Sequence, residues 1–161
     1  MEIFKTSRTL IRRFKAEDLP SICEMESDPA VMLYTGPGRA QTKEESKARL
    51  SKILDHQSQS DFDGYFAVVE ITSQKLIAWF MLLPVRDGEF EIGFMVNRSF
   101  WGQGFAFELC RVLSSRALTK HHINTIIAKV TRQNLASISV LEKCNYVLAK
   151  NDEKTMTYIL E

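Results

Sequence analysis

The stretch EIGFMVNRSFWGQGFAFELCRVLSS, residues 91–115, joins a strand-like run, a glycine-containing loop and an amphipathic helix. Apolar residues alternate in the strand-like run, which is the period of a β-strand. In the helical part, apolar residues recur at steps of three and four and share one face: Ala106, Leu109, Cys110, Leu113 and Ala117. The polar residues fill the other face: Glu108, Arg111, Ser114 and Ser115. We therefore predict a central strand that leads through a loop into a helix.

Gly102 and Gly104 stand immediately before this predicted helix. The first turn of a helix has backbone N–H groups without intrahelical partners and carries positive dipole charge, so it attracts phosphate oxygens. Glycine leaves this backbone accessible because it has no side chain. A P-loop is excluded because no Lys-Ser/Thr pair follows Gly104, and a dinucleotide fingerprint is disfavoured because Phe107 replaces its third glycine. The loop is predicted to bind phosphate in another context.

The first half of the chain predicts a strand, two helices and a run of strands. We expect one strand within residues 2–14, then a helix that begins at an N-cap, Asp18. A second helix is expected over residues 42–57, opened by a capping box of Thr42 and Glu45. The strands that follow are predicted by apolar, β-branched runs at residues 65–71, 76–85 and 89–96.

The second half predicts a strand at 124–130, a helix at 134–145 and a hairpin at 146–150 and 155–160. Asn134 is a predicted N-cap, and Asn145 stands where a left-handed residue would end the helix. A helix connects the strands at 91–96 and 124–130, so these should be parallel. The whole chain, residues 1–161, is predicted to be one α/β domain with a mixed central sheet of about six or seven strands and helices on both faces.

Composition excludes several classes of function. Lysine and arginine number 21 against 20 acidic residues, giving a net charge of +1, so no bulk attraction to nucleic acid or to an anionic membrane is expected. Cys23, Cys110 and Cys144 are widely spaced and do not have metal-ligand spacing, so we expect reduced thiols and no metal. The chain has neither a signal-like apolar core at its start nor a membrane-spanning run, which favours a cytoplasmic protein.

Separate stretches of the chain resemble one known family. Trp101–Ala106, WGQGFA, resembles the pyrophosphate-binding loop of the GNAT superfamily of N-acetyltransferases, and Trp101 in the usual Arg/Gln place is similar to the ribosomal-protein N-terminal acetyltransferase branch. The opening string of that branch is matched by Thr6, Arg8, Leu10, Arg12 and Asp18. Its second cofactor-binding segment is matched over residues 134–146, although Asn145 replaces the usual glycine.

This resemblance implies binding of acetyl-coenzyme A. It implies that backbone groups hold the pyrophosphate at Gly102, Gln103, Gly104, Phe105, Ala106 and Phe107. The family's two parallel strands splay apart, and the resemblance implies that the backbone of Met95 and Val96 there pairs with the pantetheine arm and polarises the acetyl carbonyl. Asn134 and Ser137 are further cofactor contacts by resemblance.

Catalytic residues are predicted with alternatives. Ser137 matches the family serine near the cofactor sulfur and is the candidate general acid, or else a first-turn hydroxyl that caps its helix. The tyrosine acid of many superfamily members is replaced here by Leu141. Glu91 is the candidate general base, or else part of a solvated acidic stripe or an ion pair with Arg98.

The function implied by the resemblance is acetyl transfer from acetyl-coenzyme A directly to a primary amine, on a protein N-terminus or a small molecule. A non-catalytic acyl-coenzyme A-binding sensor or partner module is the alternative. Tyr34 and Arg39 lie between the early helices and are candidate acceptor contacts, although a packing or solvated role is the plainer interpretation. The protein is expected to be a monomer or a homodimer.

Overall fold

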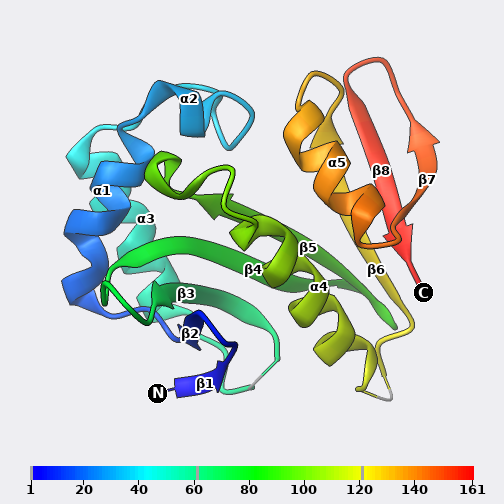
Figure 1. Cartoon of the computed structure of the whole chain (residues 1–161), viewed down its shortest axis with the longest axis horizontal. Helices are drawn as coiled ribbons and strands as arrows, with labels where there is room; N and C mark the ends of the chain where they lie inside the picture. The colour runs from blue at the N-terminus through cyan, green and yellow to red at the C-terminus, as the bar shows by residue number, and fades with distance from the viewer. Residues whose placement is uncertain (1, 61, 121) are drawn as a thin grey trace. The chain divides into compact units, whose positions relative to one another are not determined.

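The computed structural model describes residues 2–60, 62–120 and 122–161. Within these residues, hydrogen bonds join eight strands into one mixed sheet in the order β1-β2-β3-β4-β5-β6-β8-β7 (Figure 1). The strands are β1 (Glu2–Lys5), β2 (Thr9–Arg12), β3 (Gly64–Glu70), β4 (Leu76–Arg86), β5 (Glu89–Val96), β6 (Thr125–Thr131), β7 (Val147–Asn151) and β8 (Thr155–Leu160). The predicted α/β class is confirmed.

Five α-helices accompany the sheet in the described residues. They are α1 (Leu19–Glu26), α2 (Pro29–Met32), α3 (Lys43–Asp55), α4 (Phe105–Leu118) and α5 (Leu135–Lys143), with short 3-10 turns at η1 (Ala16–Asp18) and η2 (Arg98–Phe100). No helix among the described residues is both long and apolar enough to cross a membrane.

The chain divides into two compact units. The first comprises Met1–Phe80 and Met95–Trp101, and the second Met81–Phe94 and Gly102–Glu161, so that β4 and β5 contribute residues to both. The single domain over residues 1–161 stays a prediction.

In the first unit, the single strand predicted for residues 2–14 is wrong, because this segment forms an antiparallel hairpin of β1 and β2 with Phe4 opposite Ile11. The side chain of Thr6 closes the turn between them. Its hydroxyl accepts a hydrogen bond from the amide of Thr9 at 2.9 Å and also contacts the Thr9 hydroxyl at 2.8 Å. Because this turn divides the segment into two strands, the sheet of the described residues has eight strands where six or seven were predicted.

Asp18 stands at the N-cap position of α1, as predicted, but its side chain bonds elsewhere. Its carboxylate accepts hydrogen bonds from both terminal nitrogens of Arg12, at 2.7 and 2.8 Å, and from the amide of Lys15 at 2.8 Å. The side chain therefore caps η1 and makes no cap hydrogen bond to α1. The capping box of α3 is confirmed, since Thr42 and Glu45 bond each other's backbone amides.

In the second unit, β6 joins two partners of opposite direction. It runs parallel to β5 at its start and antiparallel to β8 along its length, from Ile126 opposite Leu160 to Thr131 opposite Thr155. The hairpin of β7 and β8 closes the chain beside α5 (Figure 1). The predicted parallel pair and the predicted C-terminal hairpin are therefore confirmed.

The buried face of α4 differs from the prediction at one position. Ser114 was assigned to the polar face, but it is buried and its hydroxyl lies 2.7 Å from that of Tyr146. A buried hydroxyl is tolerated where it has a hydrogen-bond partner, and Tyr146 supplies one. On α5, Leu141 is buried while Leu135 is 72% exposed.

Candidate active site

The loop before α4 adopts the backbone conformation that its glycines permit. Gly102 has φ +73° and Gly104, the N-cap residue of α4, has φ +80°, both in the left-handed region that disfavours other residues. A Cβ added at Gly102 would meet nothing within 4 Å, so its glycine is required by conformation and not by crowding. These conformations place the loop backbone at the start of α4.

Several amides at this helix start have no acceptor. Glu108 donates its amide to the carbonyl of Gly104 at 3.0 Å, which is the first turn of the helix. Within the described residues, the amides of Gly102, Gly104, Ala106 and Phe107 make no hydrogen bond. Gly102, Gln103 and Gly104 are exposed, whereas the Phe105 side chain is buried and anchors the helix. Unpaired amides at a helix N-terminus suit a diphosphate group.

The parallel ladder between β5 and β6 is short. It joins Glu89 to Thr125, Phe90 to Ile126 and Glu91 to Ile127. Beyond that point, β6 still pairs with β8 on its other side, but the described residues Ile92–Phe94 have no ladder partner on β6. The ladder between these strands therefore ends at Glu91 and Ile127, and unpaired strand backbone is suited to a ligand that adds like a strand.

Trp101 has a role that the sequence did not indicate. Its indole Nε1 donates a hydrogen bond to the carbonyl oxygen of Val96 at 2.8 Å, and its amide donates to the carbonyl of Arg98 at 3.1 Å. The indole thus closes the loop that follows β5. Met95 and Val96 are both buried, and the Val96 carbonyl has one lone pair left for a ligand.

The start of α5 separates the roles of Asn134 and Ser137. The Asn134 side-chain oxygen accepts a hydrogen bond from the Ser137 amide at 3.2 Å, so the predicted N-cap is confirmed. The Ser137 hydroxyl makes no hydrogen bond to the described residues and is half-buried. Asn134 therefore performs the capping, and the interpretation of the Ser137 hydroxyl as the cap is wrong.

Glu91 is paired with a cation, but not with the predicted one. The ammonium of Lys129 donates a hydrogen bond to Glu91 Oε2 at 2.7 Å, while Arg98 lies 3.7 Å from Asp28. Glu89 on the same strand accepts from Arg86 at 2.7 Å. The other oxygen, Glu91 Oε1, makes no hydrogen bond to the described residues, so it is the more open of the two oxygens to accept a proton.

Two thiols lie in the interior of this unit. Cys110 and Cys144 are both free and buried. A hydrogen bond with the Cys144 thiol, together with burial, raises the pKa of the Cys110 thiol. The sulfur of Cys144 also lies 3.7 Å from the Phe107 carbonyl oxygen. The Cys110 thiol therefore stays protonated and is a poor nucleophile. The same hydrogen bond between the thiols lowers the pKa of the Cys144 thiol.

In the first unit, a cavity of about 300 Å³ lies where α1, α2 and the loop after β5 meet. Its polar lining includes Glu24, which accepts a hydrogen bond from the Asn97 side chain at 3.1 Å, and the Asp28 and Arg98 pair. Neither of the predicted acceptor contacts, Tyr34 and Arg39, is among its lining residues. Arg39 instead forms a bidentate ion pair with Glu45.

A family model and a known relative that match this chain are both described as acetyltransferases. Residues 8–147 match the model of the acetyltransferase (GNAT) domain. The chain is 27% identical over 147 residues to the uncharacterized N-acetyltransferase p20 of Bacillus licheniformis, and the match covers 91% of the chain and 83% of that protein.

Solved structures show the same fold. A GNAT-family acetyltransferase from Bacillus anthracis superposes with a TM-score of 0.86 at 22% identity, over 97% of this chain and 96% of that one. RimL, a ribosomal L7/L12 alpha-N-protein acetyltransferase in complex with coenzyme A, superposes with a TM-score of 0.83 at 13% identity, over 99% and 97% of the two chains. At these identities the likeness concerns the fold.

Proposed function

Because the chain belongs to the acetyltransferase (GNAT) domain family and is an N-acetyltransferase, we propose that its donor is acetyl-coenzyme A and that it transfers the acetyl group directly to a primary amine. The first acceptor class to test is a protein N-terminus, because the chain resembles the ribosomal-protein N-terminal acetyltransferase branch. Small-molecule amines are the other class. The observation that carries the proposal is the set of unpaired amides at the start of α4.

The proposed donor fits the chemistry of these residues. The amides of Gly102, Gly104, Ala106 and Phe107 would hold its diphosphate, aided by the dipole of α4. The open edge beyond the Glu91 and Ile127 pair would hold its extended amide arm. When bound, the donor supplies an activated thioester to the attacking amine.

Direct transfer requires two proton movements. The amine nitrogen forms a bond to the acetyl carbon, the carbon–sulfur bond breaks, and the amine gives up a proton while the sulfur gains one. We assign the proton for the sulfur to the Ser137 hydroxyl, which makes no hydrogen bond to the described residues. We assign the amine proton to Glu91 Oε1, either directly or through water, because Lys129 holds the other oxygen.

The experiment has a binding arm and a turnover arm. Calorimetry with acetyl-coenzyme A should show binding, and a panel of amines should then release free thiol and gain the mass of one acetyl group. The panel should hold peptides with a free N-terminus, the same peptides N-terminally blocked as matched controls, and small amines. Absence of binding would refute the proposal. Binding without thiol release for any amine would support the non-catalytic module instead.

A further inference from the structure

Phe107 is an aromatic residue on the outside of α4. It follows the buried Phe105 by two positions, which rotates it by about 200° around the helix, away from the core stripe. Its side chain is 36% exposed, and its own amide is one of the unpaired amides at the start of the helix. A diphosphate held there would carry its attached nucleoside past this ring.

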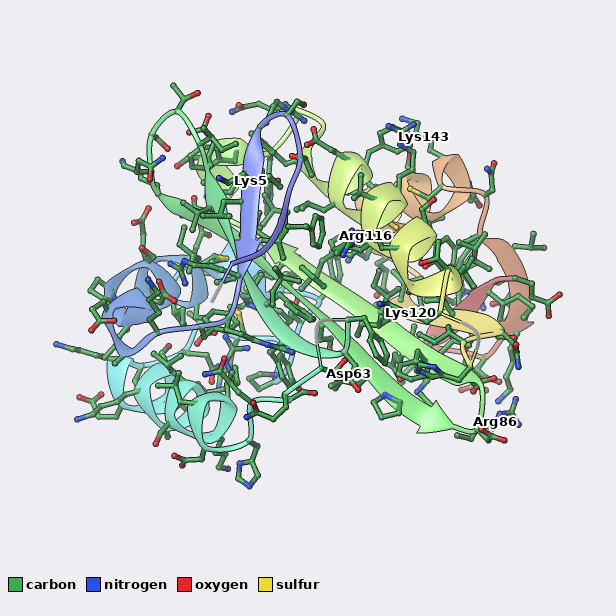
Figure 2. All side chains as sticks on the ribbon, turned by 90° about the horizontal axis from the view of Figure 1, so that it is seen from below. Lys5, Asp63, Arg86, Arg116, Lys120 and Lys143 are labelled. Atoms are coloured by element: carbon green, nitrogen blue, oxygen red, sulfur yellow. The ribbon has the colours of Figure 1, made fainter. Side chains whose placement is uncertain are left out.

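A cation accompanies the ring. The guanidinium carbon of Arg111, one turn further along α4, lies 5.8 Å from the Phe107 ring centroid, and the Arg111 side chain is exposed. The sulfur of Cys144, just after α5, lies 3.7 Å from the Phe107 carbonyl oxygen, and the neighbouring Lys143 is exposed (Figure 2). The exposed ring therefore lies beside a cation near the start of α4.

We propose that Phe107 and Arg111 form the seat for the 3′-phosphoadenosine end of the donor, with the adenine stacked on the Phe107 ring and the 3′-phosphate paired with the Arg111 guanidinium. The inference rests on the proposed use of acetyl-coenzyme A and names which side chains recognise its nucleotide end. Every base has a π-face that an aromatic ring can stack on, and guanidinium groups pair with phosphate through directed hydrogen bonds.

The plainer interpretation is a surface cation–π pair that only stabilises the helix. An exposed pair of this kind contributes ~0.5–1 kcal/mol. The two interpretations differ in one measurable respect, because a purely structural pair cannot distinguish ligands that differ only in their nucleotide end.

The test compares affinities by calorimetry for coenzyme A, 3′-dephospho-coenzyme A and 4′-phosphopantetheine, which lacks the adenosine. Phe107→Ala should weaken binding of coenzyme A and of the dephospho form alike, by about 5- to 150-fold as converted from the alanine cost of base stacking. Binding of 4′-phosphopantetheine should be unchanged. Arg111→Ala should weaken coenzyme A about tenfold or more and leave the dephospho form unchanged.

Arg116→Ala is the matched control, since it removes the same charge from an exposed position further along α4 (Figure 2). It should bind all three ligands like the wild type. Two results would overturn the seat and leave the proposed function standing. One is that Phe107→Ala binds coenzyme A with wild-type affinity, and the other is that Arg111→Ala loses affinity equally for coenzyme A and for its dephospho form. Wild-type protein that binds no coenzyme A would remove both.

Discussion

Replacing Gly104 with glutamate should disable the unpaired amides at the start of α4. The new carboxylate would lie at the positive end of the helix, where it could accept the amides itself and repel a diphosphate. A unit charge about 4 Å from a phosphate oxygen, at an effective dielectric of about 20, costs ~4 kcal/mol, or roughly 1000-fold in affinity. Because the side chain can turn into solvent, we expect a loss of about 100-fold or more for acetyl-coenzyme A.

Backbone strain must be separated from charge in this experiment. Gly104 has φ +80°, so any side chain there costs ~1–2 kcal/mol of stability. Gly104→Ala carries the strain without the charge. Gly38→Glu carries both in another turn, since Gly38 has φ +71° and an added Cβ would make only ordinary contacts. Both controls should bind acetyl-coenzyme A nearly as the wild type does.

Calorimetry measures the affinities, and thermal unfolding checks that each variant is folded, with a cost of 1 kcal/mol expected to lower Tm by about 2–4 °C. A folded Gly104→Glu protein that binds within about threefold of the wild type would refute the assignment of these amides to a diphosphate.

Ser137→Ala should lower kcat by about tenfold or more because it removes the proposed proton donor. The affinity for acetyl-coenzyme A and the Tm should change little, because the Ser137 hydroxyl bonds no described residue. An unchanged kcat would remove the role of Ser137 as the acid. Glu26→Gln should destabilise the fold by ~3–5 kcal/mol in urea unfolding, since Glu26 is 1% exposed and is the ion-pair partner of Arg49; a loss under ~1 kcal/mol would contradict this. The hydrogen bond from Arg39 lowers the pKa of Glu45 to about 2, so this contribution to stability is present above pH 4.5 and is lost as pH falls towards 2. NMR titration should show Arg39→Ala raising that pKa, and an unchanged midpoint would refute the pairing.

Local features of the fold were predictable because neighbouring residues produce them. The capping box of Thr42 and Glu45 spans three residues, and the cap at Asn134 acts on its own helix turn. Asn145 has φ +66°, as its place after the apolar stripe of α5 predicted.

Contacts between distant residues were mispredicted where several partners were chemically equivalent. Glu91 had Arg98 nearby in sequence, yet Lys129 on the neighbouring strand is its partner. Ser114 was predicted on the polar face of its helix, but its hydroxyl pairs with that of Tyr146 in the interior. In both cases the choice of partner depends on strand register and helix packing, which sequence spacing does not encode.

By itself, the sequence determined the order of strands and helices from β3 onward and the caps of α3 and α5, because periodicity and local hydrogen bonding are properties of short segments. Only the tertiary structure decided that Trp101 bonds the Val96 carbonyl, that Glu91 pairs with Lys129, and that the parallel ladder stops at Glu91 and Ile127. Each of these features depends on contacts between segments that are separate in the sequence.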